Sequence, residues 1–127
     1  MSASKGWFHY SRIDLLAAKT LFESNVEVLE SVAFHLQQCL EKAIKGFLQK
    51  KSVRFPKTHD IGQLLTLFSD EDKELVHALE PGKILTLYGV YVRYPDSVEV
   101  DLSREKIAEL LNFVEEAHEL ILKAVRD

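Results

Sequence analysis

The sequence predicts an all-α fold, an up-and-down antiparallel bundle of four to five helices. Apolar side chains recur every three to four residues in several long segments, which is the spacing of one helix face. Only residues 84–92 have the composition of a strand, and no second segment offers a strand to pair with them. The 127 residues, 46% of them hydrophobic, suit one domain with one core, so residues 1–127 are taken as a single domain.

The first half of the chain predicts two long helices. The first covers about Phe8 to Asn25, with charged residues between its apolar positions. The second begins near Leu29, ends near Lys51 and has the clearer pattern. Its broad apolar face is formed by Val32, Ala33, Leu36, Cys39, Leu40, Ala43, Ile44 and Phe47.

Shorter elements follow. Residues 53–58 contain a proline and predict a loop, after which Thr58 is a suitable N-cap for a short helix to Phe68. Ser69 with Asp72 resembles a capping box that opens a fourth helix.

The last third is read as a kink, a helix, a loop and a final helix. Pro81-Gly82 interrupts or kinks the fourth helix. Residues 84–92 are taken as helical because a lone strand has no partner. Residues 93–100, with a proline, predict a loop, and Ser103 caps a last amphipathic helix.

Composition excludes several classes of protein. The net charge of −4 argues against coating nucleic acid by bulk charge, although a local basic patch remains compatible with it. The single cysteine, Cys39, excludes an intrachain disulfide, and the five histidines lack metal-ligand spacing, so we expect no metal and no cofactor. No apolar run approaches the roughly 20 residues that span a bilayer, and the N-terminus lacks the apolar stretch of a signal peptide. We expect a cytoplasmic protein.

One candidate site lies on the second helix. At 100° per residue, His35, Gln38 and Lys42 share a sector beside the apolar face. Donors and a cation at a half-buried groove suit a phosphate or a base edge. Alternatively, His35 and Gln38 only hydrogen-bond neighbouring helices.

Two further patterns follow in the chain. Residues 42–57 hold six Lys or Arg and no acid, which suits a polyanion or, equally, a solvated helix end. His59 and Asp60 at a helix start resemble a general-base pair, but adjacent helical residues do not face each other. The alternative is that Thr58 and Asp60 cap the helix while His59 packs against the long helix.

The last candidate is an arginine after an apolar segment. The planar fork of Arg93 suits a phosphate, and Tyr94 could stack on a base. In the alternative interpretation, Arg93 and Asp96 only pair across the loop.

Together these residues resemble the HEPN family from about Trp7 to Ala124. The resemblance rests on four stretches in order: Asp14-Leu15 with Ala17-Ala18, residues 34–42 (FHLQQCLEK), residues 57–61 (KTHDI), and Arg93-Tyr94-Pro95. It implies a helical bundle that forms a homodimer, commonly paired with a minimal nucleotidyltransferase in a toxin–antitoxin-type system. Long apolar side chains in residues 84–92, and Phe34 turned away from its helix's apolar face, also predict a dimer interface.

Other members of that family are metal-independent RNases with an arginine followed, after about four to six residues, by a histidine. Counting from Arg93, those positions are Val98, Glu99 and Val100, so this chain departs from the RNase pattern.

The leading hypothesis is a nucleotide- or nucleic-acid-binding module that works with a partner nucleotidyltransferase. Its expected ligand-binding residues are His35, Gln38, Lys42, Arg93 and Tyr94, with His59 and Asp96 supporting. The alternatives are a divergent metal-independent RNase toxin and a purely structural interaction protein.

Overall fold

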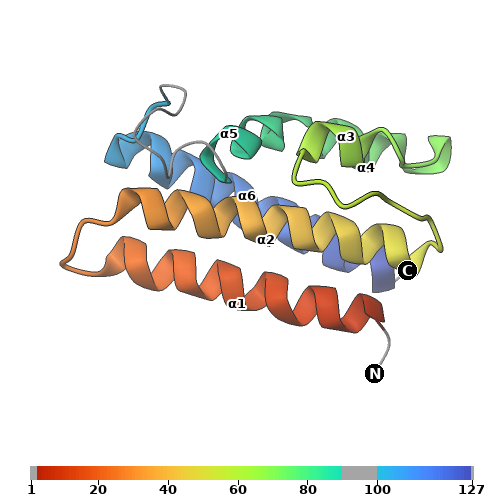
Figure 1. The fold of residues 1–127 in the computed structure, drawn as a ribbon, viewed down its shortest axis with the longest axis horizontal. Helices are drawn as coiled ribbons and strands as arrows, with labels where there is room; N and C mark the ends of the chain where they lie inside the picture. Colours follow the sequence, from red (N-terminus) through yellow and green to blue (C-terminus); the bar gives the residue numbers. More distant parts are fainter. Residues whose placement is uncertain (1–2, 90–99, 127) are drawn as a thin grey trace.

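The computed structural model describes residues 3–89 and 100–126, which form a helical bundle (Figure 1). Its long helices are α1 (Ala3–Glu23), α2 (Leu29–Lys50) and α6 (Arg104–Arg126). The shorter segments are α3 (Ile61–Leu65), η1 (Asp70–Asp72), α4 (Lys73–Leu79), η2 (Glu80–Ile84) and α5 (Leu85–Gly89). Within the described ranges there is no strand, and the prediction of an all-α, up-and-down bundle is confirmed.

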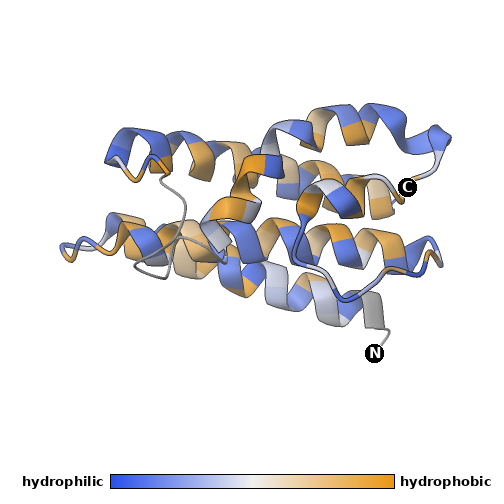
Figure 2. Cartoon of the chain, turned by 45° about the horizontal axis from the view of Figure 1, so that its top comes forward, coloured by the Kyte–Doolittle hydropathy of each residue, from blue (hydrophilic) through white to orange (hydrophobic). Residues whose placement is uncertain are grey.

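Helix α2 is the centre of the bundle. It runs antiparallel to α1, and it packs against α6, α5 and α3 on its other sides (Figure 1). The apolar sides of the helices turn toward one another (Figure 2), and Leu36, Leu40 and Ile44 of α2 are completely buried. At Gly46, an added Cβ would lie 2.9 Å from the Phe8 ring and 3.1 Å from the Trp7 Cβ. The absence of a side chain there lets α1 approach α2 closely.

The predicted start of the third helix is wrong by two residues. Asp60, not Thr58, is the N-cap of α3, because its Oδ1 accepts a hydrogen bond from the Gln63 backbone N–H at 3.1 Å. The Thr58 hydroxyl instead accepts from the Asp60 N–H at 3.1 Å and donates to Gln63 Oε1 at 2.8 Å. Helix α3 also ends at Leu65 and does not reach Phe68.

The other predicted helix ends agree with the structure in some cases and not in others. Ser69 makes no capping bond, and its hydroxyl lies 3.3 Å from the Asp72 carboxylate, because a 3₁₀ turn rather than an α-helix begins there. Pro81 falls within the 3₁₀ segment η2 between α4 and α5, as a kink requires. Ser103 does cap α6, accepting the Lys106 N–H at 3.1 Å. The predicted loop at 93–100 lies outside the described residues except for its last residue.

A buried polar contact joins α1 to α6. Ser11 is fully buried, donates to the Phe8 carbonyl at 2.9 Å and lies 2.8 Å from His118 Nε2. Since the serine proton is already used, Nε2–H of His118 donates to Ser11 Oγ. Burial, reinforced by nearby Arg12, lowers the pKa of His118 below its ordinary 6.5.

This contact predicts an acid-sensitive α1–α6 junction. The folded state holds the pKa of His118 below 6.5, so the unfolded chain takes up the proton first as the pH falls. The contribution to stability is complete above about pH 6.5 and declines below it. We expect His118→Gln to flatten the loss of stability between about pH 7 and pH 5 in urea unfolding. Exposed His77→Gln is the control. An unchanged pH dependence in His118→Gln would contradict this assignment.

Candidate functional site

A buried carboxylate of α1 joins two predicted ligand-binding residues of α2. Asp14 accepts from His35 Nδ1 at 2.8 Å through one oxygen and from Lys42 Nζ at 2.7 Å through the other. His35 and Lys42 are two helical turns apart on one side of α2, and Asp14 lies between them on α1. His35 and Lys42 therefore meet at one carboxylate of a neighbouring helix, a contact that the alternative interpretation of His35 also expects, and Asp14 is the residue that joins them.

The pairing fixes which atoms remain available. A carboxylate only accepts, so Nδ1 of His35 carries the hydrogen, and Nε2 is left for another partner. Lys42 retains two further N–H donors and lies 5.9 Å from the centre of the Tyr10 ring. Tyr10 is 56% exposed, so its ring also has a face open to solvent. An aromatic face, an imidazole nitrogen and an ammonium group meet at this surface of the α1–α2 contact.

The second cluster surrounds Glu41, whose side chain is almost fully buried. Lys45, equally buried, donates to Oε2 at 2.9 Å, and Gln37 donates to Oε1 at 2.6 Å. The Nδ1 of His59, on the loop before α3, reaches both oxygens at 3.1 and 3.2 Å. Both oxygens of the carboxylate therefore accept hydrogen bonds, as a buried charge requires.

The structure separates residues that the sequence placed together. Gln38 does not reach the Asp14 cluster, because its amide donates to Gln37 Oε1 at 2.7 Å and so extends the Glu41 cluster. His59 also belongs to the Glu41 cluster, which agrees with its packing against the long helix. Phe34 is half-buried rather than exposed and lies edge-on to His35 at 5.5 Å. Arg93, Tyr94 and Asp96 lie outside the described residues.

Asp14 and the buried Glu41–Lys45 pair were not predicted to shape a site. The signal for the second is the four-residue spacing of Gln37, Glu41 and Lys45, which makes them a polar stripe along the inner side of α2. No periodicity of α1 alone marks Asp14 as buried, because the partners of its carboxylate come from α2.

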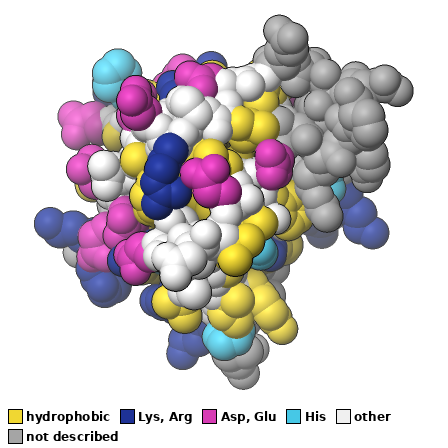
Figure 3. Space-filling model, turned by 90° about the vertical axis from the view of Figure 1, so that its left-hand side faces the viewer, with side chains coloured by type: hydrophobic (Ala, Val, Ile, Leu, Met, Phe, Trp, Pro, Cys, Tyr) yellow, Lys and Arg dark blue, Asp and Glu magenta, His cyan; other side chains and the backbone are white. Residues whose placement is uncertain are grey.

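The described residues do not support a thiol nucleophile or a metal site. Burial raises the pKa of the Cys39 thiol strongly, so this cysteine is no nucleophile. Within residues 3–89 and 100–126, no three His, Cys, Asp or Glu side chains are grouped to hold a metal ion. At the end of the bundle near the α1–α2 connection, acidic, basic and apolar side chains are interspersed (Figure 3), so a phosphate site must rest on local charge.

A match to one family model identifies the family of this chain. The model of the HEPN domain matches residues 4–125, almost the whole chain. The chain belongs to the HEPN family. Its HEPN fold is similar to that of ST0689, an archaeal HEPN homologue, with a TM-score of 0.71 at 20% identity over 98% of this chain and 99% of that one.

A second solved structure has the same HEPN fold. The protein TT1696 from Thermus thermophilus gives a TM-score of 0.77 at 21% identity over 97% of this chain and 98% of the other. No curated protein matches this HEPN domain in sequence. Among the helices of the described ranges, none is both long and apolar enough to cross a membrane.

Proposed function

We propose that this HEPN domain is a nucleotide- or RNA-binding module whose ligand phosphate contacts Lys42 and His35. The observation that carries the proposal is the attachment of both side chains to the single Asp14 carboxylate. Each is held by a short hydrogen bond while keeping donor or acceptor atoms for a ligand. Holding them in place lowers the entropy lost on binding.

The surroundings suit a nucleotide better than a simple anion. Asp14 offsets part of the positive charge, so a lone phosphate gains less here than at an unpaired lysine. The exposed Tyr10 ring beside Lys42 adds a stacking surface for a base. A ligand that carries both a base and a phosphate uses all three groups.

We expect Lys42→Ala to weaken binding of a short oligouridine about tenfold or more, because a hydrogen bond to a charged group contributes roughly 1.5–3 kcal/mol. Calorimetric titration measures the loss, with His35→Ala as a second variant. Lys73→Ala, which removes an exposed lysine of α4, is the matched control and should bind as wild type. Equal binding by wild type and Lys42→Ala would refute the proposed phosphate contact.

One observation favours the RNase alternative. Asp14 orients His35 as a carboxylate orients a catalytic base, with Nε2 directed away from it. The arginine–histidine spacing of the RNase members is missing, however, and we expect no comparable cleavage. Metal-independent cleavage of single-stranded RNA that His35→Ala abolishes would establish the alternative function.

The family relationship also leads us to propose a homodimer and a partner nucleotidyltransferase in a toxin–antitoxin-type pair. Supporting the dimer, Ile13 and Leu16 of α1 are 47% and 66% exposed, which is much apolar surface for one helix. Analytical ultracentrifugation measures the mass, and co-expression with a neighbouring nucleotidyltransferase tests the pair.

A further inference from the structure

A pocket with aromatic walls lies at the N-terminal end of α1, beyond the Asp14 cluster. It has a volume of about 440 Å³ and is lined by Trp7, Lys45 and the loop residues 55–59. Trp7 and Phe55 meet edge to face, with ring centres 6.1 Å apart. The buried Lys45 ammonium lies 5.5 Å from the Trp7 ring and 5.8 Å from the Phe55 ring. Glu41 fixes that ammonium, which therefore attracts both rings before any ligand arrives.

The pocket continues the surface that carries Lys42 and Tyr10. Trp7 and Tyr10 are one turn apart on α1, and Lys45 and Lys42 are one turn apart on α2. Two cation–aromatic pairs, Lys42 with Tyr10 and Lys45 with Trp7, therefore follow each other along the same side of the α1–α2 contact. The segment from His35 to Lys45 spans about 15 Å along the axis of α2. One nucleotide of a duplex strand spans about 3.4 Å along its own axis. This surface has room for more than one nucleotide.

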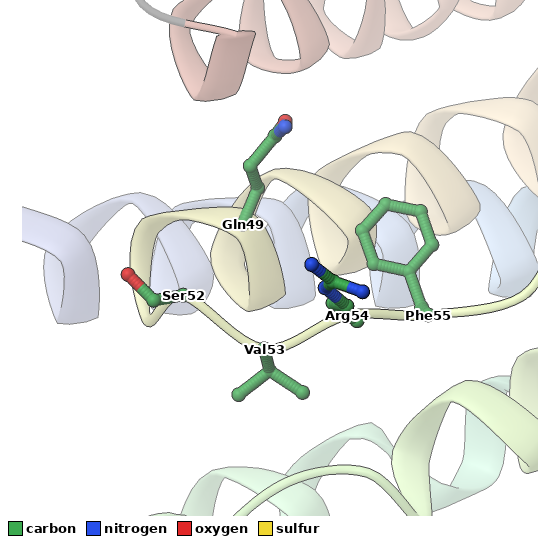
Figure 4. A pocket seen from close by; sticks show the side chains of 5 residues that line it. All are labelled: Gln49, Ser52, Val53, Arg54 and Phe55. Atoms are coloured by element: carbon green, nitrogen blue, oxygen red, sulfur yellow. The ribbon is translucent and has the colours of Figure 1, made fainter.

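Two cationic side chains lie beside the pocket. Lys57, at its edge, and Arg54 are exposed, and neither forms an ion pair within the described parts of the chain. Arg54 lines an adjoining hollow of about 420 Å³ that shares Phe55 with the aromatic pocket (Figure 4). In that view Gln49 and Phe55 point to one side of the connection after α2, and Val53 points to the other. Basic residues of the segment 42–57, which contains no acid, thus border the aromatic pocket.

We infer that the Trp7–Phe55 pocket, with Arg54 and Lys57 beside it, is a second subsite for single-stranded RNA. It takes a base against the two rings while Arg54 and Lys57 bind the adjoining phosphates. This inference rests on the proposed function and extends it, since the ligand is then a strand that runs along α1 and α2 and not a mononucleotide. A hydrophobic peptide would use the rings but leave the two cations without partners.

The chain's single tryptophan, Trp7, makes the pocket directly observable. We expect oligouridine to quench Trp7 fluorescence, and Phe55→Ala to weaken binding about five- to 150-fold, the range for loss of one stacked base. The double variant Arg54→Ala/Lys57→Ala removes only exposed side chains and should keep the fold. It should reduce the slope of log affinity against log salt by about 1.4, since each phosphate contact contributes about 0.7 on a single strand.

The control is Lys73→Ala/Lys123→Ala, which removes two exposed lysines from α4 and α6 and should reproduce the wild-type slope. One outcome would overturn the second subsite and leave the proposed function intact. In that outcome calorimetry shows oligouridine binding, the Trp7 emission does not change, and Arg54→Ala/Lys57→Ala has the wild-type slope of log affinity against log salt. If neither the wild type nor any variant binds oligouridine, both the second subsite and the proposed function are overturned. Quenching by an apolar peptide but not by RNA would identify a peptide groove and also overturn the inference.

Discussion

Glu41→Ala should destabilise the protein by about 3–5 kcal/mol, the usual effect of leaving a buried charge without its partner. Lys45 is 6% exposed, and its ammonium donates to Glu41 at 2.9 Å. Without the carboxylate, Gln37 and His59 also lose their acceptor. Urea unfolding followed by circular dichroism measures the change.

Two companion variants separate the charge from the contacts. Glu41→Ala/Lys45→Met removes both charges and should recover much of the lost stability, because no buried ion remains unpaired. Glu74→Ala, which removes an exposed carboxylate of α4, should change stability by less than about 0.5 kcal/mol. A loss of under about 1 kcal/mol in Glu41→Ala would mean that water reaches the pair.

Phe47→Ala should destabilise the protein by about 3–5 kcal/mol, as expected for a phenylalanine removed from a core. Phe47 is 1% exposed, and its ring stacks on Phe68, with centres 4.9 Å apart and planes 9° from parallel. It joins α2 to the short segments after α3, which have little core of their own. The same unfolding experiment measures the loss.

The exposed Leu120 of α6 is the control, since Leu120→Ala removes an apolar side chain from a helix without opening a cavity. The Phe68→Ala variant should lose less than Phe47→Ala, because Phe68 is only partly buried. If Phe47→Ala unfolds at the wild-type urea concentration, the stacked pair does not hold the segments after α3 against α2.

The long helices could be predicted because each has an apolar face of its own. The pattern from Val32 to Phe47 gave α2 within a residue at its C-terminal end, and Ser103 was read correctly as the cap of α6. The short α3 was harder to bound, because Thr58 and Asp60 are both good capping residues and only the three-dimensional path of the loop selects Asp60.

The candidate site was predictable only within one helix. The spacing of His35 and Lys42 placed them on one side of α2, and in the structure both side chains reach the same carboxylate. That spacing could not show that Asp14 would bind both, or that Gln38, only three residues from His35, would turn to Gln37. The contacts of Asp14 depend on how α1 lies on α2, which Gly46 allows to be close and no local pattern specifies.

The most direct test of the binding surface is amide chemical-shift mapping of the labelled protein with a short oligouridine. We predict that the largest shifts lie at Tyr10, Asp14, His35 and Lys42, with little change at the C-terminal end of α6. Shifts confined to other surfaces, or none at millimolar oligonucleotide, would contradict the assignment of the Asp14–His35–Lys42 cluster as a phosphate and base site.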